Sequence, residues 1–381
     1  MLRADIIRAS AIGPLENAQW KAMVLATPGL ANPLLGPEFA HAVGAVRDDA
    51  WVAVLKRDSG TAGFLPFHRC GRGYARPIGA PFSDYQTLVS DPSAPIGLRE
   101  ALRAAGLNRF RFGAAVDPHG TFAPLACRGR LAFPIDVGTL GTDAYLDALR
   151  LRNPKHFKRW RQLACKLGRE IGPVELVFGE PSGDAFERAI AWKRAQLRRT
   201  GMFDVLRPSW VRDLMDDLFA RQGQEFGGLH VALWAGGRHV ASSFGVRSGR
   251  AFHSWIAAFD PELGEYGPGR VLHFKGIEAM AQAGLDLWDL GPDHGEWKRR
   301  FVLDPITVFA GVAEARSLGL RLPSPSHFTP APIAAVLGKV AGRLEHIAAA
   351  EPTASGRLTG VLDALAHGHR RLSLAGAQAE A

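Results

Sequence analysis

The segment Tyr266–Leu272, with the sequence YGPGRVL, combines residue types that can bind an anion. Its two glycines allow a ligand to approach the backbone closely, and its arginine adds a charged donor. An apolar pattern of helical spacing follows, so the segment precedes a helix whose first N–H groups carry the positive end of the dipole. A junction with proline in the first helical turn and no ligand has the same pattern, and the sequence leaves both interpretations open. The candidate cofactor-binding residues are Tyr266, Gly267, Gly269, Arg270 and Val271.

The composition favours anionic partners and a reducing compartment. The 381 residues carry a formal net charge of +9, and 47% of them are hydrophobic, which suits two globular domains or one long one. Three widely spaced cysteines predict free thiols. His294 and Glu296 have no second histidine or cysteine at ligand spacing, so we expect no metal site. Without a visible leader or a long apolar run, a cytoplasmic protein is expected.

Two pairs of segments repeat at nearly the same offset. Residues 101–113 read ALRAAGLNRFRFG and residues 279–291 read AMAQAGLDLWDLG, with an offset of 178. The sequence VAVL at 52–55 resembles VALW at 231–234, with an offset of 179. Two independent matches at nearly one offset predict two copies of one structural unit.

Strand and turn signals give an element order that is clearest in the second copy. Three β-rich runs at 228–237, 238–249 and 250–260 end in glycine-containing turns, which predicts an antiparallel meander. A helix follows and ends near Gly284, and residues 285–290 form a strand beside the third. Two helices precede the meander, and residues 306–312 form a further strand. In the first copy, the same plan predicts strands within 50–60, 61–70, 83–91 and 108–116, and a helix at 96–105.

This order resembles the GNAT acyltransferase fold, and the tandem pair resembles the FemABX-type and the BioF2-like or cellulose-biosynthesis-type acyltransferases of bacteria. The segments that carry the resemblance are PIGAPFSDYQTLVSD, YGPGRVLHFKGIEAM and DLGPDHGEWKRRF. In the last of them, Asp289, Gly291, Trp297 and Lys298 match the family's Asp-x-Gly and later aromatic-Lys pair. The resemblance implies an α/β (α+β) fold of two tandem GNAT-like domains, each with a mixed, mostly antiparallel sheet flanked by helices.

The predicted domains follow from the repeat and the resemblance. Residues 1–140 form an N-terminal GNAT-like domain with the acceptor cleft, and 141–172 a basic connector helix. Residues 173–320 form a C-terminal GNAT-like domain with the acyl-donor site, and 321–381 a linker and a helical tail. The second copy is assigned the donor because SDPSAPIGLREAL, at the equivalent place in the first copy, lacks the paired glycines and their arginine.

The resemblance implies transfer of an acyl group from acyl-CoA to an amino sugar or a related acceptor in bacterial exopolysaccharide or envelope synthesis. The nucleophile must then lose a proton, the oxyanion must be stabilised and the leaving group must be protonated. Glu265 or His253 would act as the base, directly or through a water, and Asp289 lies where the next strand ends. Tyr266 or Tyr85 would return a proton to the leaving group.

Other polar residues near the predicted cleft would bind substrates. Lys298 completes the catalytic candidates and, with Arg299, would bind an anionic group of the donor or acceptor. The candidate substrate-binding residues are Asp84, Tyr85, Trp297 and Arg299. Each has a structural alternative: Asp289 can cap a turn, and a histidine on a strand such as His253 is often a satisfied buried side chain.

Two other functions fit the same residues. The first is an aminoacyl-tRNA-dependent transferase of the FemABX type. The second is a non-catalytic effector-binding protein of a polysaccharide system. For the latter, Arg357, Arg370 and Arg371 with His367 and His369 could hold a cyclic dinucleotide, unless they form a frayed terminus.

Residues 150–169 hold eight Lys and Arg and no Asp or Glu. Such a run is typical of a solvated helix face, and it also suits a phosphate-bearing substrate, an anionic membrane surface or tRNA. Only Phe157 and Trp160 are aromatic in it, so it does not predict a stacking surface, and we expect no DNA partner.

An apolar helical pattern from Ile333 to Ile347 predicts a helix that packs on the body or docks on a membrane or partner. Peripheral association with the inner membrane is therefore one expectation.

Overall fold

The computed structural model describes residues 1–292, 295–316 and 331–362. These residues belong to two compact units. The first unit comprises Met1–Lys193 and Asp213–Ala315, and the second comprises Arg194–Arg212 together with the chain after residue 315. The predicted linker before the helical tail and most of the predicted arginine and histidine cluster, including His367, His369, Arg370 and Arg371, lie outside the described residues.

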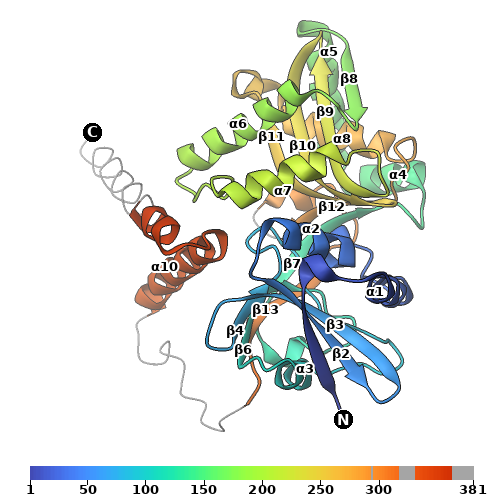
Figure 1. Cartoon of the computed structure of the whole chain (residues 1–381). Helices are drawn as coiled ribbons and strands as arrows, with labels where there is room; N and C mark the ends of the chain where they lie inside the picture. Colours follow the sequence, from blue (N-terminus) through green and yellow to red (C-terminus); the bar gives the residue numbers. More distant parts are fainter. Residues whose placement is uncertain (293–294, 317–330, 363–381) are drawn as a thin grey trace. The chain divides into compact units, whose positions relative to one another are not determined.

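The first unit is built on one mixed sheet of 13 strands (Figure 1). The strand order is β1-β2-β3-β4-β6-β13-β7-β12-β11-β10-β9-β8, and β5 pairs with β3 outside this path. The strands are β1 (Arg3–Arg8), β2 (Ala50–Arg57), β3 (Gly60–Arg69), β4 (Tyr74–Pro77), β5 (Val89–Ser90), β6 (Arg109–Ala115), β7 (Ala126–Asp136), β8 (Val174–Phe178), β9 (Phe226–Ala235), β10 (Arg238–Ser248), β11 (Ala251–Phe259), β12 (Leu287–Pro292) and β13 (Ile306–Glu314).

Helices connect these strands and cover the sheet. The α-helices are α1 (Pro14–Ala26), α2 (Pro37–Val46), α3 (Leu98–Ala104), α4 (Thr142–Arg152), α5 (Pro154–Glu170), α6 (Gly183–Arg199), α7 (Ser209–Ala220), α8 (Pro268–Ala279), α9 (Glu296–Arg299) and α10 (Ala331–Ala350). The 3-10 turns are η1 (Ala9–Ala11), η2 (Pro33–Leu35), η3 (Ala123–Leu125) and η4 (Pro261–Tyr266).

The structure confirms the predicted repeat. In the first copy β2, β3 and β4 form an antiparallel meander, and α3 leads to β6, which pairs with β4 in parallel. In the second copy β9, β10 and β11 form the meander, and α8 leads to β12, parallel to β11. In both copies a left-handed glycine follows the helix: Gly106 with φ 65° after α3, and Gly284 with φ 66° after the turn that follows α8. A conformation that favours glycine is thus needed at the same place in each copy.

The two copies share the sheet rather than forming separate ones. β7 pairs with β12 of the second copy on one side and with β13 on the other, and β13 also pairs with β6. The predicted strand at 306–312 is therefore present, and its hydrogen-bonded partners lie in the first half of the chain. The boundaries at 140 and 173 stay a prediction.

The structure corrects two expected elements. Within 83–91 only Val89 and Ser90 are in a strand, and β4 is the third strand of the meander. The Gln86 carboxamide oxygen accepts the N–H groups of Gly113 and Ala114, so a side chain replaces ladder bonds there. The connector at 141–172 was predicted as one helix but forms two, α4 and α5, because Pro154 cannot continue α4.

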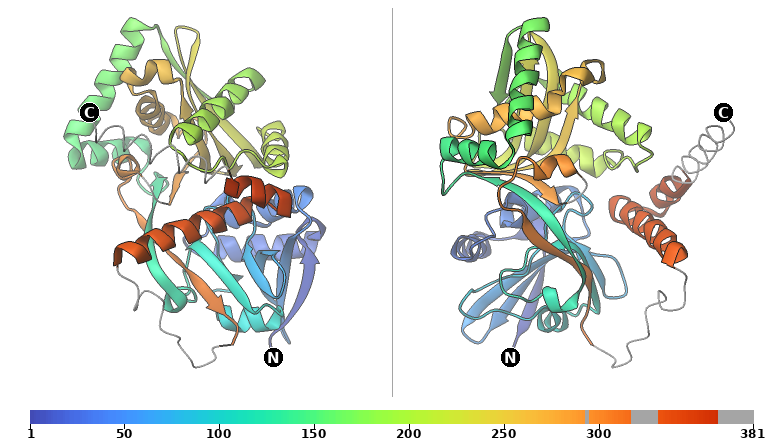
Figure 2. Two further views of the ribbon diagram at one scale, coloured as in Figure 1. Left: turned by 90° about the vertical axis from the view of Figure 1, so that its left-hand side faces the viewer. Right: turned by 180° about the vertical axis from the view of Figure 1, so that it is seen from behind.

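Helices cover both faces of the sheet around the second copy (Figures 1 and 2). On one face, Trp160 of α5 and Phe274 of α8 belong to a buried core, and Trp160 stacks on Phe301 with ring centroids 4.2 Å apart. On the other face, Phe186 of α6 stacks on Phe219 of α7 and packs edge-on against a phenylalanine of β10. The sheet is thus buried on both sides where β11 and β12 lie side by side.

The second unit contains the α6–α7 connection and α10. The indole N–H of Trp210 donates to the carbonyl of Ala350 at 2.8 Å, and Arg207 forms an ion pair with the buried Glu351. These contacts hold the end of α10 against the segment Arg194–Arg212. None of the described helices is long and apolar enough to cross a membrane.

Candidate active site

Five polar side chains from both halves of the chain meet in one hydrogen-bonded cluster, the central cluster. His253 of β11 and Asp289 of β12 lie opposite each other in parallel register. The His253 Nε2 atom lies 2.9 Å from Asp84 Oδ2, and Tyr85 donates its hydroxyl proton to Asp289 Oδ1 at 3.0 Å. Asn32, just before η2, is the fifth member. Thus four sequence-predicted site residues, Asp84, Tyr85, His253 and Asp289, come together although up to 205 residues separate them in the chain.

Asn32 fixes the orientation of His253. The Leu34 N–H donates to Asn32 Oδ1 at 3.0 Å, so the amide nitrogen must face the other way. That nitrogen lies 2.8 Å from His253 Nδ1 and donates to it, which makes Nδ1 the unprotonated acceptor. The proton of the neutral ring is therefore on Nε2, and it is donated to Asp84. A chain of donors runs from the Leu34 backbone to the Asp84 carboxylate.

Asp289 is a buried carboxylate that three donors satisfy. They are the Tyr85 hydroxyl, the Asn32 amide at 3.1 Å and the Gly291 N–H at 2.7 Å. Asp289 is only 2% exposed, so these bonds replace the water that a charged group needs. Burial and then the Asp289 charge raise the pKa of Tyr85 well above its usual value, so Tyr85 stays protonated and remains a donor.

Asp84 is the exposed member of the central cluster. Its side chain is 36% exposed, whereas His253 is fully buried. Its Oδ2 accepts from His253, and no other hydrogen bond to Asp84 is found among the described residues. A Cβ added at Gly291 would lie 2.9 Å from Asp84 Oδ2, so a glycine is needed there for Asp84 to occupy this place. The Asp84 carboxylate can therefore accept a proton from a substrate that lies on the solvent side of the cluster.

The cluster lies where two parallel strands part. β11 and β12 pair only over Ala251–His253 and Leu287–Asp289, and beyond this point β12 continues beside β7. The register of β10 and β11 shifts at the same place, so Trp255 has no partner in the ladder. The bulge therefore disrupts the ladder between β10 and β11 at the level of the central cluster.

The η4–α8 turn has the features of a phosphate-binding turn. Gly267 adopts φ 58°, and a Cβ there would lie 2.6 Å from an Arg270 guanidinium nitrogen, so the space that glycine leaves holds the arginine. The Gly269 N–H makes no hydrogen bond among the described residues, and a Cβ on Gly269 would meet only Phe259, at 3.7 Å. Val271 is buried in the core and its N–H is bonded to Gly267, so only its position, and not its side chain, belongs to this turn.

Glu265 and Tyr266 lie in a different set of contacts. The Glu265 side chain is 65% exposed and pairs with Lys166 at 2.6 Å. Tyr266 donates its hydroxyl to Glu170 at 3.2 Å, and the Lys166 ammonium lies over its ring. The structure therefore does not bring these two predicted residues to the central cluster; they tie η4 to α5.

Of the predicted residues of α9, Lys298 points back to β12. Its ammonium donates to the carbonyl of Leu290 at 2.6 Å. Trp297 packs against His273, with ring centroids 4.9 Å apart, and Arg299 is exposed. Burial, which outweighs the bond to the Gly269 carbonyl, lowers the pKa of His273 to about 4. Its Nε2 is buried without a partner among the described residues.

Sequence reasoning missed Asn32 and Lys193. Lys193 of α6 is half-buried, and its pKa is lowered by burial and by the nearby Lys298 charge, against the attraction of Asp84. Asn32 precedes Pro33, which is an ordinary turn signal. Nothing in the local sequence shows that its side chain will meet residues of two strands more than 200 residues away. In the described part of the chain, no group of three or more potential ligands could hold a metal ion.

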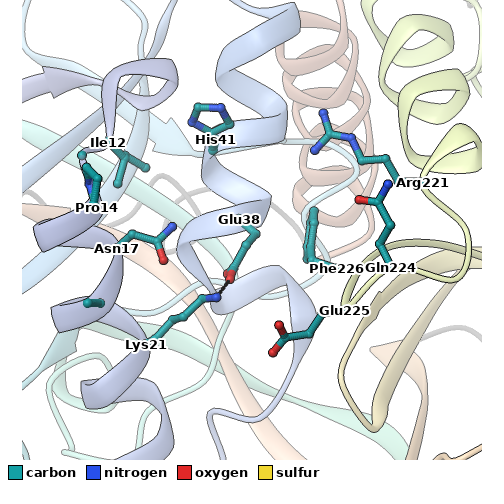
Figure 3. A pocket seen from close by; sticks show the side chains of 12 residues that line it. Ile12, Pro14, Asn17, Lys21, Glu38, His41, Arg221, Gln224, Glu225 and Phe226 are labelled. Atoms are coloured by element: carbon teal, nitrogen blue, oxygen red, sulfur yellow. Dashed lines mark ion pairs between the residues drawn. The ribbon is translucent and has the colours of Figure 1, made fainter.

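A separate open hollow of about 790 Å³ lies between α1, α2 and the start of β9 (Figure 3). Its walls carry an ion pair between Lys21 and Glu38, and include His41, Arg221 and Glu225. It contains no member of the central cluster. We assign the chemistry to the central cluster because buried, oriented polar groups meet there, while the polar groups of the hollow lie on an open surface.

Comparisons with known proteins identify one domain. Residues 154–299 match the model of the acetyltransferase (GNAT) domain family. No curated protein matches the chain. Three solved structures resemble it: a tandem GNAT protein from the clavulanic acid biosynthesis pathway (12% identity, 83% of this chain and 99% of that chain, TM-score 0.46), FemX (12%, 78% and 94%, 0.49) and L-PGS from Bacillus licheniformis (11%, 81% and 94%, 0.43).

Proposed function

We propose, from the match of residues 154–299 to the acetyltransferase (GNAT) domain family, that the protein is an N-acyltransferase that uses an acyl-CoA donor. The observation that carries the proposal is the position of the central cluster. It lies at the point where β11 and β12 part, and residues of the first copy complete it. Parting strands with a bulge and an oriented carboxylate beside them suit a reaction at a thioester carbonyl.

The η4–α8 turn would hold the donor. Acyl-CoA supplies an activated acyl thioester and carries phosphates. The unpaired Gly269 N–H, the Arg270 guanidinium and the start of a 12-residue helix suit a pyrophosphate. The backbone at the Trp255 bulge would donate to the carbonyl oxygen as it gains negative charge.

Asp84 would act on the acceptor. An amine must lose a proton before it can attack a carbonyl, and the exposed Asp84 carboxylate can accept that proton. His253 holds Oδ2 of Asp84 by its Nε2–H, while the Asn32 amide, which also donates to Asp289, keeps the ring in one tautomer. In this proposal His253 and Asp289 are positioning residues rather than bases.

Lys298 would serve the leaving group. A thiolate that departs near β12 requires a proton or a nearby cation, and the Lys298 ammonium is held at this end of β12 by the Leu290 carbonyl. Lys193 is a second amine nearby, and burial and the Lys298 charge lower its pKa. An amino sugar is the first acceptor to test, as expected for polysaccharide or envelope synthesis.

The test separates donor binding from chemistry. Calorimetry with acetyl-CoA and hexanoyl-CoA would be run on the wild type, on Gly269→Val and on a matched control, Gly264→Val, whose Cβ would meet no atom within 4 Å. We expect micromolar binding that Gly269→Val weakens at least about 10-fold, because a larger side chain blocks the approach to its N–H. Thiol release with glucosamine would then be compared for Asp84→Asn and Asp289→Asn.

Donor binding with loss of transfer in Asp84→Asn supports the proposal. If none of these acyl-CoA species binds, the donor assignment is wrong, and a charged tRNA would be tested next. If transfer is normal in both carboxylate variants, the central cluster is not the active site.

A further inference from the structure

The exposed face of α5 carries cations without carboxylate partners. Lys155, Lys158, Arg159 and Arg161 are exposed, and no ion pair or hydrogen bond to their side chains is found among the described residues. We call these four residues the α5 cationic face. The opposite face of the helix buries Trp160, and so fixes which side of α5 turns outward. α5 lies on the outside of the first unit (Figures 1 and 2).

Acidic residues lie at both ends of this face and not within it. Asp143 and Asp147 are exposed on α4, before the break at Pro154. At the other end, Glu170 and Glu265 pair with Lys166 and Arg169. Between them, about two turns of helix present positive charge alone. Like charges at this spacing repel one another, so the face is more stable when an anionic partner covers it.

One exposed leucine adjoins this face. Leu151, at the end of α4 and four residues before Lys155, has a side chain that is 81% exposed. A leucine that projects beside a row of lysines and arginines is typical of surfaces that contact a lipid bilayer, since the cations meet anionic headgroups while the leucine inserts below them. By contrast, single-stranded nucleic acid is bound by exposed aromatic rings, and the aromatic residues of α5 face the core.

We propose that the α5 cationic face, together with Leu151, docks the protein on an anionic membrane surface. The docking places η4, which is bonded to the end of α5, on the same side of the protein as the headgroups. This inference does not rest on the acyltransfer chemistry, because it uses none of the residues of the central cluster.

Vesicle co-sedimentation of the full chain tests the proposal. The vesicles are phosphatidylcholine alone, or phosphatidylcholine with about 30 mol% phosphatidylglycerol, which gives an anionic surface. We expect binding only to the anionic vesicles, with loss at high salt. The variant K155E/K158E/R159E/R161E should reduce the partition coefficient more than about 100-fold, since each cation near such a surface contributes roughly five-fold.

A charge-matched control distinguishes this surface from the net charge of the protein. The variant R72E/R99E/R111E/R128E changes four exposed arginines of the first copy and alters the net charge by the same amount. It should retain most of the binding. Equal loss in both variants would overturn the proposal, because the effect would then come from the total charge.

Leu151→Ser distinguishes lipid from other polyanions. It should weaken vesicle binding several-fold and leave retention on heparin unchanged, since only a bilayer offers an apolar layer below the charges. The membrane assignment is wrong if the serine variant binds vesicles like the wild type. It is also wrong if RNA, at the same phosphate concentration as the lipid, displaces the protein from the vesicles. Circular dichroism of each variant checks that α5 still forms.

Discussion

Removal of the Tyr85 hydroxyl gives the sharpest test of the central cluster. Tyr85→Phe leaves the ring in its buried place and takes away one of the three donors to Asp289. A hydrogen bond to a buried charged group contributes about 1.5–3 kcal/mol, so we expect the free energy of unfolding to fall by about 2 kcal/mol. The same bond holds Asp289 in its orientation, and a loss of about 2 kcal/mol in the transition state would slow transfer by roughly 30-fold.

A double-mutant cycle with Asp289→Asn isolates the bond. In the asparagine background the acceptor is neutral, so deletion of the hydroxyl should cost about 1 kcal/mol less than in the wild type. Unfolding in urea gives the stability of each variant, and thiol release from acetyl-CoA gives its activity. Additive effects in both measurements would refute a direct Tyr85–Asp289 interaction.

Tyr145→Phe is the matched control. Tyr145 is also 1% exposed in the first unit, and its hydroxyl donates at 2.8 Å to the Phe301 carbonyl, away from the central cluster. The same hydroxyl accepts the Leu303 N–H at 3.3 Å, so its loss removes two bonds between neutral groups. It should lower the stability by about 2 kcal/mol and should not change transfer. If Tyr145→Phe slows transfer as much as Tyr85→Phe, the effect is a general loss of packing, and our reasoning fails.

Three further predictions follow from the same geometry. Gly291→Ala should lower transfer at least about 10-fold, since its Cβ would press on Asp84 at φ 75°, whereas Gly249→Ala, with φ 53° and open space around its Cβ, should retain activity. Asn32→Ala should slow transfer without weakening acyl-CoA binding in calorimetry, because the Asn32 side chain bonds only to the positioning residues His253 and Asp289 and to the Leu34 N–H of η2. His273 has a pKa of about 4 in the folded chain and a normal value near 6.5 when unfolded, so it contributes stability above pH 6.5 that is lost as the pH falls to 4. Its contribution is about 3 kcal/mol, and urea unfolding of His273→Leu should depend less on pH over that range.

The repeat made much of the fold predictable. Gly106 and Gly284 follow equivalent helices and have the same left-handed conformation, and such a requirement leaves an identical residue at both places. The shared sheet could not be predicted in this way. The residue pattern of β7 is compatible with many antiparallel partners. Only the tertiary structure decides that it pairs with β12 on one side and with β13 on the other.

The central cluster was predictable to the extent that its members lie in unusual local sequences. Asp84 and Tyr85 follow a proline, and Asp289 is followed by Gly-Pro, so each stood out as a candidate. Glu265 stood out for the same reason, beside the glycine-rich turn, yet its side chain is exposed and paired with Lys166. A local pattern shows that a residue ends an element, and it does not show toward which neighbour the side chain turns.

The contribution of the first copy explains why the site needs both halves. In β11 and β12 alone, His253 and Asp289 would be a buried histidine and a buried carboxylate 4.0 Å apart, with only the Gly291 N–H to offset the negative charge. Asn32 and Tyr85 add the two missing donors to Asp289, and the same Asn32 amide keeps the Nδ1 proton away from His253. The ring must then direct its only proton toward Asp84, the one member of the cluster that solvent reaches. The first copy thus turns a costly buried pair into an oriented acceptor, and a second-copy fragment expressed alone would lack both the orientation and the acceptor.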